Sequence, residues 1–262
     1  MPINLNIQHS LQTIATEARI AWAVKVNSDR RAHWHHPLTA LNYARAAERV
    51  GLWASERKII TEHFDTQSRI LELGCGGGRV GLGLWHLGYQ NVLLSDFSPE
   101  MVDIAESVLK QAGVGYKVEI ADACELPYPD QAFDGVIFAF NGLMCLRGQA
   151  DRLKALPEIH RILKPEGKFL FTANDREKGE HTHEWANEPC LPDGQLGDRW
   201  HETDSTPVFM HSSTEAETTS ELKHTHFNLI LSALRSDIAP ESAEVRAFAG
   251  ETRFYLAEKA LR

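Results

Sequence analysis

The sequence predicts an α/β protein with a doubly wound, mostly parallel sheet. Short apolar runs alternate with segments of helical periodicity from about residue 69 to residue 173. A glycine-rich turn follows the first apolar run, and acidic residues follow the next two. Such alternation requires crossover connections, and these connections place successive strands parallel to one another in a single sheet.

Composition limits the classes of protein that this chain can belong to. Its 262 residues suffice for one large domain or for a domain with a cap. Lys and Arg number 27 and Asp and Glu 36, giving a net charge of −9, which lowers the expectation of nucleic-acid binding. The four cysteines show no CxxC spacing, which favours reduced thiols and a cytoplasmic location. We expect neither a signal peptide nor a membrane-spanning segment.

The N-terminal quarter is expected to be helical. Apolar residues recur at helical spacing in two stretches before residue 51, and residues 53–64 continue the pattern. We interpret residues 1–66 as a helical N-terminal cap and residues 67–262 as the main domain. Within that domain, residues 174–206 are polar and rich in His, Asp, Gly and Pro. They are expected to form an insertion or lid with little regular structure.

The elements of the main domain can be assigned in chain order. Strands are expected at 70–73, 91–95, 116–120, 133–138, 168–172, 227–234 and 253–258. Helices are expected at 79–87, 98–111, 151–163 and 214–223. Ser98 and Pro99 supply an N-cap and a proline at the first helical position. Pro157 is expected to kink or break its helix.

Three features follow the first three strands, where a doubly wound sheet binds its ligand. The glycines of the first turn, Gly74, Gly76 and Gly78, permit positive φ angles and close approach of a ligand. Asp96 closes the second strand, about 20 residues later, at the distance where a carboxylate can bind ribose hydroxyls. Asp122-Ala123 follows the third strand, and its carboxylate can accept a hydrogen bond from an adenine amino group. Phe97 and Met101 could pack on the adenine ring.

These features resemble the class I S-adenosylmethionine-dependent methyltransferases. Segment 72–78, ELGCGGG, is similar to their glycine-rich first motif, and Asp96 to their ribose-binding acid. Asp122-Ala123 with the following LPY resembles their adenine-side segment. Segments 133–137 and 163–168 are similar to their fourth strand and to the turn before their fifth. Glu166 departs from the glycine usual in that turn.

The resemblance implies S-adenosylmethionine as the cofactor and a seven-stranded sheet with an antiparallel last strand. The methyl donor is already activated, so such an enzyme needs mainly to align the reactants and exclude water.

Several residues have both a functional and a structural interpretation. Glu72 is expected to bind the amino-acid part of the cofactor, although it could simply stabilise the turn. Asn141, after the fourth strand, is a candidate to contact cofactor or substrate, with a turn residue as the equal alternative. Trp34 and Tyr43 could line the substrate pocket, although packing within the cap explains them slightly better. An aromatic wall would also attract a sulfonium.

Histidines are frequent in the N-terminal region and in the insertion. His181-x-His183 could supply metal ligands, but two histidines without a third partner do not define a site. We therefore expect no metal, and we consider His181 and His183 as candidate general bases.

The sequence thus favours a methyltransferase that modifies an O, N or S atom of a small molecule. A methyltransferase of tRNA or protein is the alternative within the same class. An NAD-dependent oxidoreductase is a second alternative, since Gly76-x-Gly78-x-x-Gly81 formally fits a dinucleotide-binding motif. We discount that motif because Gly74, not Gly76, directly follows the strand. A ligand-binding module without catalytic activity is the third.

Overall fold

The computed structural model describes residues 33–178, 182, 194–201, 203 and 207–260. The described helices are α2 (Pro37–Arg49), α3 (Ala54–His63), α4 (Arg79–His86), α5 (Pro99–Gln111), η1 (Gly142–Cys145, a 3-10 helix), α6 (Gly148–Ile162), α8 (Glu215–His224), α9 (Arg235–Ile238) and α10 (Ala243–Phe248). The strands are β1 (Ile70–Leu73), β2 (Val92–Asp96), β3 (Lys117–Ile120), β4 (Phe133–Phe138), β5 (Leu163–Asp175), β6 (Asp198–His201), β7 (Val208–Ser213), β8 (Phe227–Leu234) and β9 (Arg253–Lys259).

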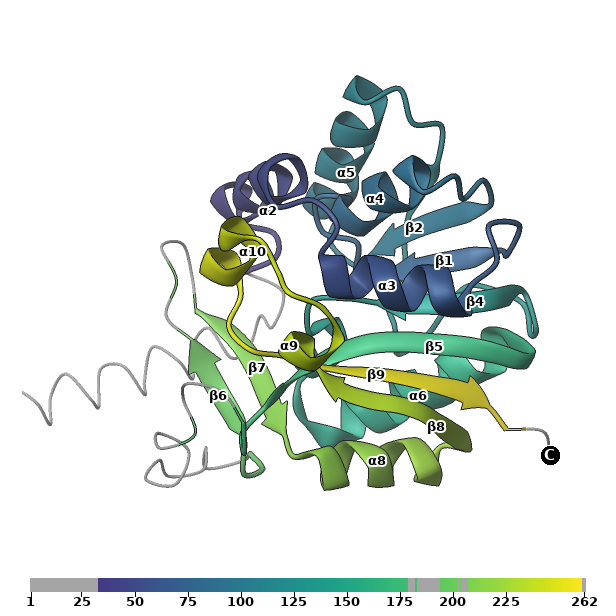
Figure 1. Ribbon diagram of the computed structural model, residues 1–262, viewed down its shortest axis with the longest axis vertical. Coiled ribbons are helices and arrows are strands. Elements are labelled where there is room, and N and C mark those ends of the chain that lie inside the picture. Colours follow the sequence, from purple (N-terminus) through teal and green to yellow (C-terminus); the bar gives the residue numbers. More distant parts are fainter. Residues whose placement is uncertain (1–32, 179–181, 183–193, 202, 204–206, 261–262) are drawn as a thin grey trace, which may run out of the picture.

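The sheet has the arrangement that the sequence predicts. Strands β3, β2, β1, β4 and β5 lie side by side and parallel. β9 pairs antiparallel with β5, and β8 pairs antiparallel with β9 (Figure 1). These seven strands confirm the expected core with an antiparallel last strand. Because β1 to β5 are parallel, their carboxyl ends meet at one edge of the sheet.

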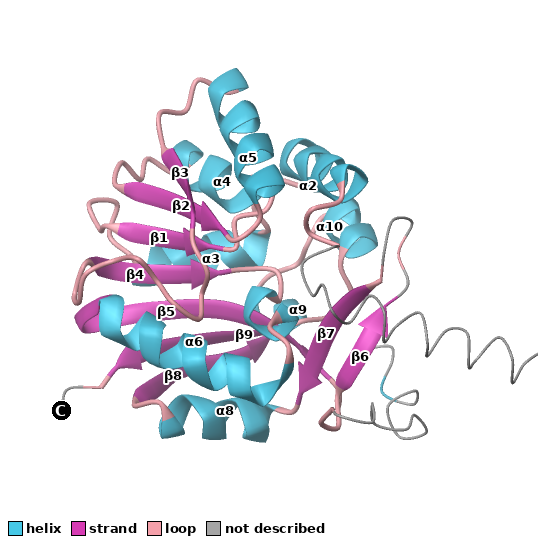
Figure 2. Cartoon of the chain, turned by 180° about the vertical axis from the view of Figure 1, so that it is seen from behind, coloured by secondary structure: helices cyan, strands magenta, loops and turns pink. Residues whose placement is uncertain are grey.

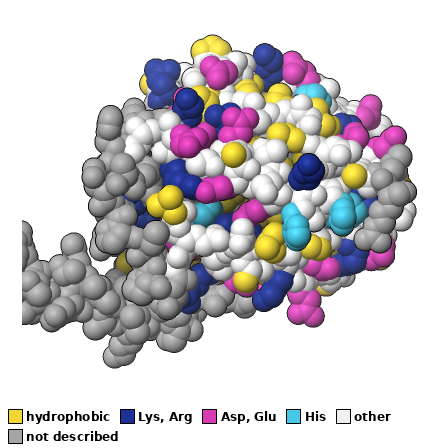
Figure 3. All heavy atoms as spheres, turned by 90° about the horizontal axis from the view of Figure 1, so that it is seen from below, with side chains coloured by type: hydrophobic (Ala, Val, Ile, Leu, Met, Phe, Trp, Pro, Cys, Tyr) yellow, Lys and Arg dark blue, Asp and Glu magenta, His cyan; other side chains and the backbone are white. Residues whose placement is uncertain are grey.

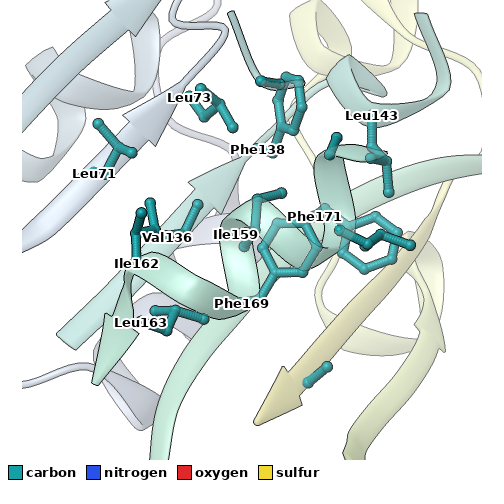
Figure 4. Packing of buried hydrophobic residues seen from close by; sticks show 14 of the residues in the cluster. Leu71, Leu73, Val136, Phe138, Leu143, Ile159, Ile162, Leu163, Phe169 and Phe171 are labelled. Carbon is teal, nitrogen blue, oxygen red and sulfur yellow. The ribbon is translucent and has the colours of Figure 1, made fainter. Parts of the chain in front are cut away.

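Side chains that alternate along the strands face two helical layers. Phe169 and Phe171 of β5 pack on one face with α6, whereas Leu170 lies on the opposite face with α3 and α4. Figure 4 shows the first cluster, with Ile159 and Ile162 of α6 over the strands. Full burial of each large apolar side chain contributes about 1.5–3 kcal/mol, so these two clusters hold both layers on the sheet.

The helices before β1 occupy two different places. α3 packs on the sheet face, where the Tyr89 hydroxyl donates hydrogen bonds to the carbonyls of Ile60 (3.2 Å) and Phe64 (2.9 Å). α2 lies beyond the carboxyl edge of the sheet (Figures 1 and 2). The predicted helix around Leu11–Ala21 lies outside the described residues.

Two elements differ in detail from the expectation of a kink or break at Pro157 and of an insertion with little regular structure. α6 continues through Pro157 without a break; the packing of α6 on the sheet outweighs the backbone hydrogen bond that proline removes. Residues 174–206 were expected to contain little regular structure, but β6 lies within them and forms a hairpin with β7. β7 extends the end of β5 by pairing Ser212 with Asn174.

Glu166, the departure from the family pattern, has a φ of 61°. This left-handed conformation costs a residue with a Cβ more than it costs glycine. The left-handed backbone conformation at residue 166 therefore explains why glycine is usual at this place in the turn.

Candidate cofactor and acceptor site

The turn between β1 and α4 has the conformation that its glycines permit. Gly74, Gly76 and Gly78 have φ angles of 64°, 53° and 79°. A Cβ on Gly74 would lie 2.5 Å from the Phe138 ring, and one on Gly76 would lie 2.9 Å from the Tyr43 ring. Side chains at these positions would therefore both strain the turn and fill space at the carboxyl edge of the sheet.

Asp96, the last residue of β2, joins this turn to the start of α5. Its Oδ2 accepts a hydrogen bond from the Gly76 N–H (2.9 Å), and its Oδ1 accepts one from the Ser98 N–H (3.0 Å). The side chain is buried, and burial raises the pKa of its carboxyl. Because each carboxylate oxygen has further acceptor capacity, Asp96 can fix the turn and still accept hydrogen bonds from ligand hydroxyls.

The segment before α2 closes one side of the site. The Ser98 hydroxyl donates to the Trp34 carbonyl (2.9 Å), and His35 Nδ1 lies 2.5 Å from Glu100 Oε2. The rings of His35 and Phe97 meet edge to face with centroids 6.0 Å apart. These contacts hold residues 34 and 35 against the start of α5.

The third acidic position follows β3. Asp122 Oδ1 accepts a hydrogen bond from the Cys124 N–H (2.9 Å), which fixes the carboxylate at the end of the strand. Asp122 also lines the cavity, where a carboxylate is the type of group that accepts a hydrogen bond from an amino group.

One cavity collects most of the predicted site residues. Eight of them line it: Trp34, Tyr43, Gly74, Gly76, Asp96, Phe97, Asp122 and Ala123. Four do not: Glu72, Gly78, Met101 and Asn141. Gly78 is the N-cap of α4, and Met101 is fully buried within α5. His181 and His183 lie outside the described residues.

Glu72 lies behind the glycine turn. It is 3% exposed, and its Oε2 has no hydrogen-bond partner among the described residues. Burial raises the pKa of the Glu72 carboxyl to about 8. The neighbouring Arg79 is already engaged, since its guanidinium makes two 2.6 Å hydrogen bonds to the Glu56 carboxylate. Glu72 is therefore a buried carboxyl with one oxygen, Oε2, that has no hydrogen-bond partner among the described residues.

Aromatic residues that were not predicted also line the cavity. They are Phe138 and Phe140 at the end of β4, and Trp200 and Phe209 of the β6–β7 hairpin. Trp200 and Phe209 are cross-strand partners whose ring centroids lie 5.7 Å apart. Trp200 lies between the polar residues Arg199 and His201, and this alternation is the sequence pattern that could have predicted a strand with an aromatic side chain on one face.

Cys145 also lines the cavity. Burial raises the pKa of its thiol to about 12. At neutral pH the thiol is therefore protonated and unsuited to nucleophilic attack.

Comparison with known proteins agrees with the geometry. Residues 70–167 match a family described as a methyltransferase domain. A demethylmenaquinone methyltransferase from Thermus thermophilus is 39% identical over 103 residues, which cover 39% of this chain and 45% of that protein. A ubiquinone/menaquinone biosynthesis C-methyltransferase from Vibrio cholerae is 36% identical over 106 residues, covering 39% of each chain. The chain thus spans less than half the length of these curated relatives.

Solved structures share the fold. A methyltransferase structure from Methanosarcina mazei has a TM-score of 0.65 and 22% identity, covering 78% of this chain and 98% of that one. The [4+2]-cyclase SpnF has a TM-score of 0.64 and 17% identity, covering 89% and 96%. A cyclase among these structures illustrates that this fold alone does not define the reaction.

The glycine turn and the acidic residues at the ends of β2 and β3 lie within the region that matches a methyltransferase domain, residues 70–167. The fold of the chain is similar to that of a solved S-adenosylmethionine-dependent methyltransferase.

Proposed function

We propose that this protein transfers a methyl group from S-adenosylmethionine to a small aromatic acceptor. The observation that carries the proposal is a single cavity with two unlike sets of lining residues. The glycine turn, Asp96 and Asp122 form one set, here called the nucleoside wall, and Phe140, Trp200 and Phe209 belong to the other, here called the aromatic wall. The first wall suits a nucleoside, and the second suits a planar apolar molecule.

The acidic residues have roles that follow from their positions. Asp96 would accept hydrogen bonds from the ribose hydroxyls, and Asp122 would accept one from the adenine amino group. Glu72 would stabilise the positively charged amino-acid end, directly or through water, because its Oε2 has no hydrogen-bond partner among the described residues. Gly74 and Gly76 leave the space that side chains would fill.

S-adenosylmethionine supplies an activated methyl group on a sulfonium. The chain therefore has to hold the acceptor in line with that methyl group and to exclude water. The rings of Tyr43 and Phe140 lie with centroids 6.3 Å apart at the cavity. Such aromatic faces can attract a sulfonium while keeping the reaction volume free of competing hydrogen-bond acceptors.

The names of the relatives support an aromatic acceptor. The Thermus and Vibrio proteins are named for methylation in menaquinone or ubiquinone synthesis, and the Vibrio protein is named a C-methyltransferase. We therefore extend the candidate acceptor atoms from O, N and S to an electron-rich ring carbon. A general base would remove the accompanying proton, and His181 and His183 stay the proposed candidates.

Other partners and the location are also part of this proposal. No helix among the described residues is long and apolar enough to cross a membrane. The free thiols of Cys75, Cys124 and Cys145 support a cytoplasmic location. The face shown in Figure 3 mixes acidic and basic side chains, and with the net charge of −9 it supports a small-molecule acceptor over nucleic acid.

Calorimetric titration with S-adenosylmethionine, S-adenosylhomocysteine and NAD tests the proposal first. We expect micromolar binding of the first two and none of NAD. Incubation with labelled S-adenosylmethionine and a panel of quinols, catechols and phenols then tests methyl transfer. Binding of NAD alone would contradict the methyltransferase assignment. Cofactor binding without transfer to small molecules, tRNA or protein would favour a non-catalytic module.

A further inference from the structure

A second cavity lies on the other face of the β6–β7 hairpin. Phe209 of β7 lines the cavity of the two walls, here called the cofactor cavity, whereas its neighbours Val208 and Met210 line the second. Because side chains alternate along a strand, the hairpin presents one face to each cavity.

The two cavities adjoin at the end of β4. Phe140 lines both, and the next residue, Asn141, lines the second. The end of β5 and the segment between α10 and β9 supply further lining residues. The second cavity has a volume of about 300 Å³, which is at the lower end of the range for ligand pockets. It therefore has room for one group of a ligand that extends past Phe140 from the cofactor cavity.

The backbone at this junction is strained. Phe140 and Asn141 have φ angles of 51° and 61°, in the left-handed region that bulky side chains rarely adopt. The Asn141 N–H donates a 2.9 Å hydrogen bond to the Thr172 hydroxyl, which helps to hold this conformation. Such strain is found mainly at ligand sites, where the surroundings maintain it.

Part of the second cavity is apolar. The rings of Phe140 and Phe248, which both line it, are stacked with centroids 4.8 Å apart. Val208, Met210 and Ala249 add further apolar surface. This surface can pack against the carbon atoms of a ligand ring, so the few polar atoms of the cavity decide which ligands it selects.

Three buried side chains that line the second cavity contain polar atoms without hydrogen-bond partners among the described residues. These atoms are Asn141 Oδ1, Ser212 Oγ and Thr252 Oγ1. The three residues are 3%, 1% and 1% exposed. Leaving a buried polar group unpaired costs free energy, so three around one cavity indicate a ligand with donors and acceptors. Because a hydroxyl can move between staggered rotamers, Ser212 and Thr252 can turn theirs towards such a ligand.

The charged side chains of the second cavity already have partners or lie in solvent. Asp175 Oδ2 accepts a 2.8 Å hydrogen bond from an arginine Nε of β9, and Glu251 Oε1 accepts one of 3.2 Å from a backbone N–H. Arg199 and His201 also have interactions within the structure. Lys178 is exposed, so its ammonium is hydrated. The unpartnered groups are therefore an amide oxygen and two hydroxyls, which favour an uncharged ligand group over an ion.

We propose that the second cavity binds an uncharged, hydroxyl-bearing group of the methyl acceptor, such as a sugar ring, while the ring that is methylated lies in the cofactor cavity. Ser212 and Thr252 would exchange hydrogen bonds with the hydroxyls of that group, and Asn141 Oδ1 would accept one. Phe140 would contact both rings. This inference rests on the proposed function, because it names the acceptor class of the same site.

Calorimetry on the complex with S-adenosylhomocysteine tests the inference. The probes are two matched pairs, phenyl β-D-glucoside with phenol, and the monoglucoside of hydroquinone with hydroquinone. We expect at least one glucoside to bind about tenfold more tightly than its aglycone, which is the gain from one or two net hydrogen bonds. Phenyl β-D-glucuronide carries a carboxylate in place of a hydroxymethyl group, and it should bind no more tightly than phenyl β-D-glucoside.

A double variant tests which residues cause the preference. Ser212→Ala with Thr252→Val removes two hydroxyls that lack partners within the described part of the chain, with little change of shape. It should abolish most of the preference for the glucoside and should still bind S-adenosylhomocysteine. Because the free protein loses no hydrogen bond, its thermal unfolding temperature should not fall. Ser220→Ala with Thr66→Val, at two exposed positions that line neither cavity, is the matched control and should keep the preference.

The outcomes are distinguishable from failure of the proposed function. Absence of S-adenosylhomocysteine binding would overturn the function itself. Binding of S-adenosylhomocysteine with no preference for either glucoside, or a preference that survives the double variant, would overturn only this inference. Tenfold tighter binding of the glucuronide than of the glucoside would also overturn it, because the second cavity would then select an anion.

Discussion

The two walls of the cofactor cavity are built in different ways. The nucleoside wall consists of residues at the carboxyl ends of three neighbouring strands, and backbone N–H groups hold its key carboxylate in place. The aromatic wall combines Phe140 with Trp200 and Phe209, which come from distant parts of the chain. The first wall is thus encoded locally, and the second exists only after the hairpin has docked.

This difference has a functional meaning. The nucleoside wall depends on backbone geometry at the sheet edge, which any member of the family must reproduce to bind the same cofactor. The aromatic wall stands on an added hairpin, and such additions can vary without disturbing the sheet. We therefore expect substitutions in the first wall to affect cofactor binding and those in the second to affect the acceptor.

Asp96→Ala should give the largest effect. It removes a carboxylate that accepts two backbone hydrogen bonds and is proposed to bind the ribose. Charge-assisted hydrogen bonds contribute about 1.5–3 kcal/mol each, so affinity for S-adenosylhomocysteine should fall about 100-fold by calorimetry. Asp103→Ala, on the exposed face of α5, is the control. Unchanged affinity in Asp96→Ala would show that this wall does not bind the cofactor.

Glu72→Gln should change the pH dependence of stability. Burial raises the pKa of Glu72 to about 8 from 4.5, so the folded state retains a proton that the unfolded chain releases. The contribution of Glu72 to stability is therefore present below about pH 4.5 and is lost as pH rises to about 8. Each pH unit in that window lowers the free energy of unfolding by up to about 1.4 kcal/mol. Urea unfolding from pH 5 to 8 should show a smaller slope for Glu72→Gln.

The same carboxyl should link cofactor binding to protons. A cationic amino group favours ionised Glu72, so affinity for S-adenosylhomocysteine should rise towards pH 8 and binding should release a proton. Binding enthalpies in buffers of different ionisation enthalpy measure that release. An equal release in Glu72→Gln would assign the proton to another group.

Trp200→Ala should weaken binding of the acceptor and leave binding of the cofactor nearly unchanged. Loss of a large ring from the aromatic wall should raise the KM of the acceptor about tenfold, which corresponds to about 1.4 kcal/mol, while cofactor affinity changes less than twofold. Steady-state kinetics with the best acceptor of the phenol and quinol panel measures this. A comparable loss of cofactor affinity would show that the two walls are not functionally separate.

His35→Ala should give the smallest effect. The hydrogen bond from His35 lowers the pKa of the Glu100 carboxyl, which is a stabilising contribution above pH 4.5 that is lost as the pH falls. The pair is partly exposed, so it contributes about 0–1 kcal/mol. The midpoint temperature of thermal unfolding of His35→Ala at pH 7 should therefore be lower than that of the unmodified protein by a few degrees at most. A larger decrease would mean that residues 34 and 35 are more important for folding than these contacts indicate.

Local patterns predicted most of the secondary structure. The alternation of apolar and helical segments located the seven core strands, and Ser98-Pro99 placed the start of α5 correctly. Asp96 was placed at a strand end because it closes an apolar run, and Asp122 because it comes just after the predicted strand that ends at Ile120. The β6–β7 hairpin was missed because its strands are short and lie in a polar segment, where sheet pairing outweighs local preference.

The surroundings of individual site residues were less predictable. Asn141 was expected near the cofactor or substrate, and it lies in the second cavity, where its Nδ2 donates to Asn174 Oδ1 (3.2 Å). Glu72 was expected to bind the amino-acid part of the cofactor, directly or through water, or to stabilise the turn; it is buried and does not line the cavity. Both placements depend on where α4 and the hairpin pack.

The sequence by itself determined the alternation of strands and helices, the mostly parallel sheet and the carboxyl edge where the glycine turn and the acidic residues meet. These features follow from the short-range periodicity of apolar residues and from glycine and acidic residues at fixed distances along the chain. Only the tertiary structure decided which aromatic rings close the cavity and that a second, polar cavity lies behind the hairpin. Those features require side chains more than fifty residues apart to meet, and their burial and pairing are properties of packing that no local pattern contains.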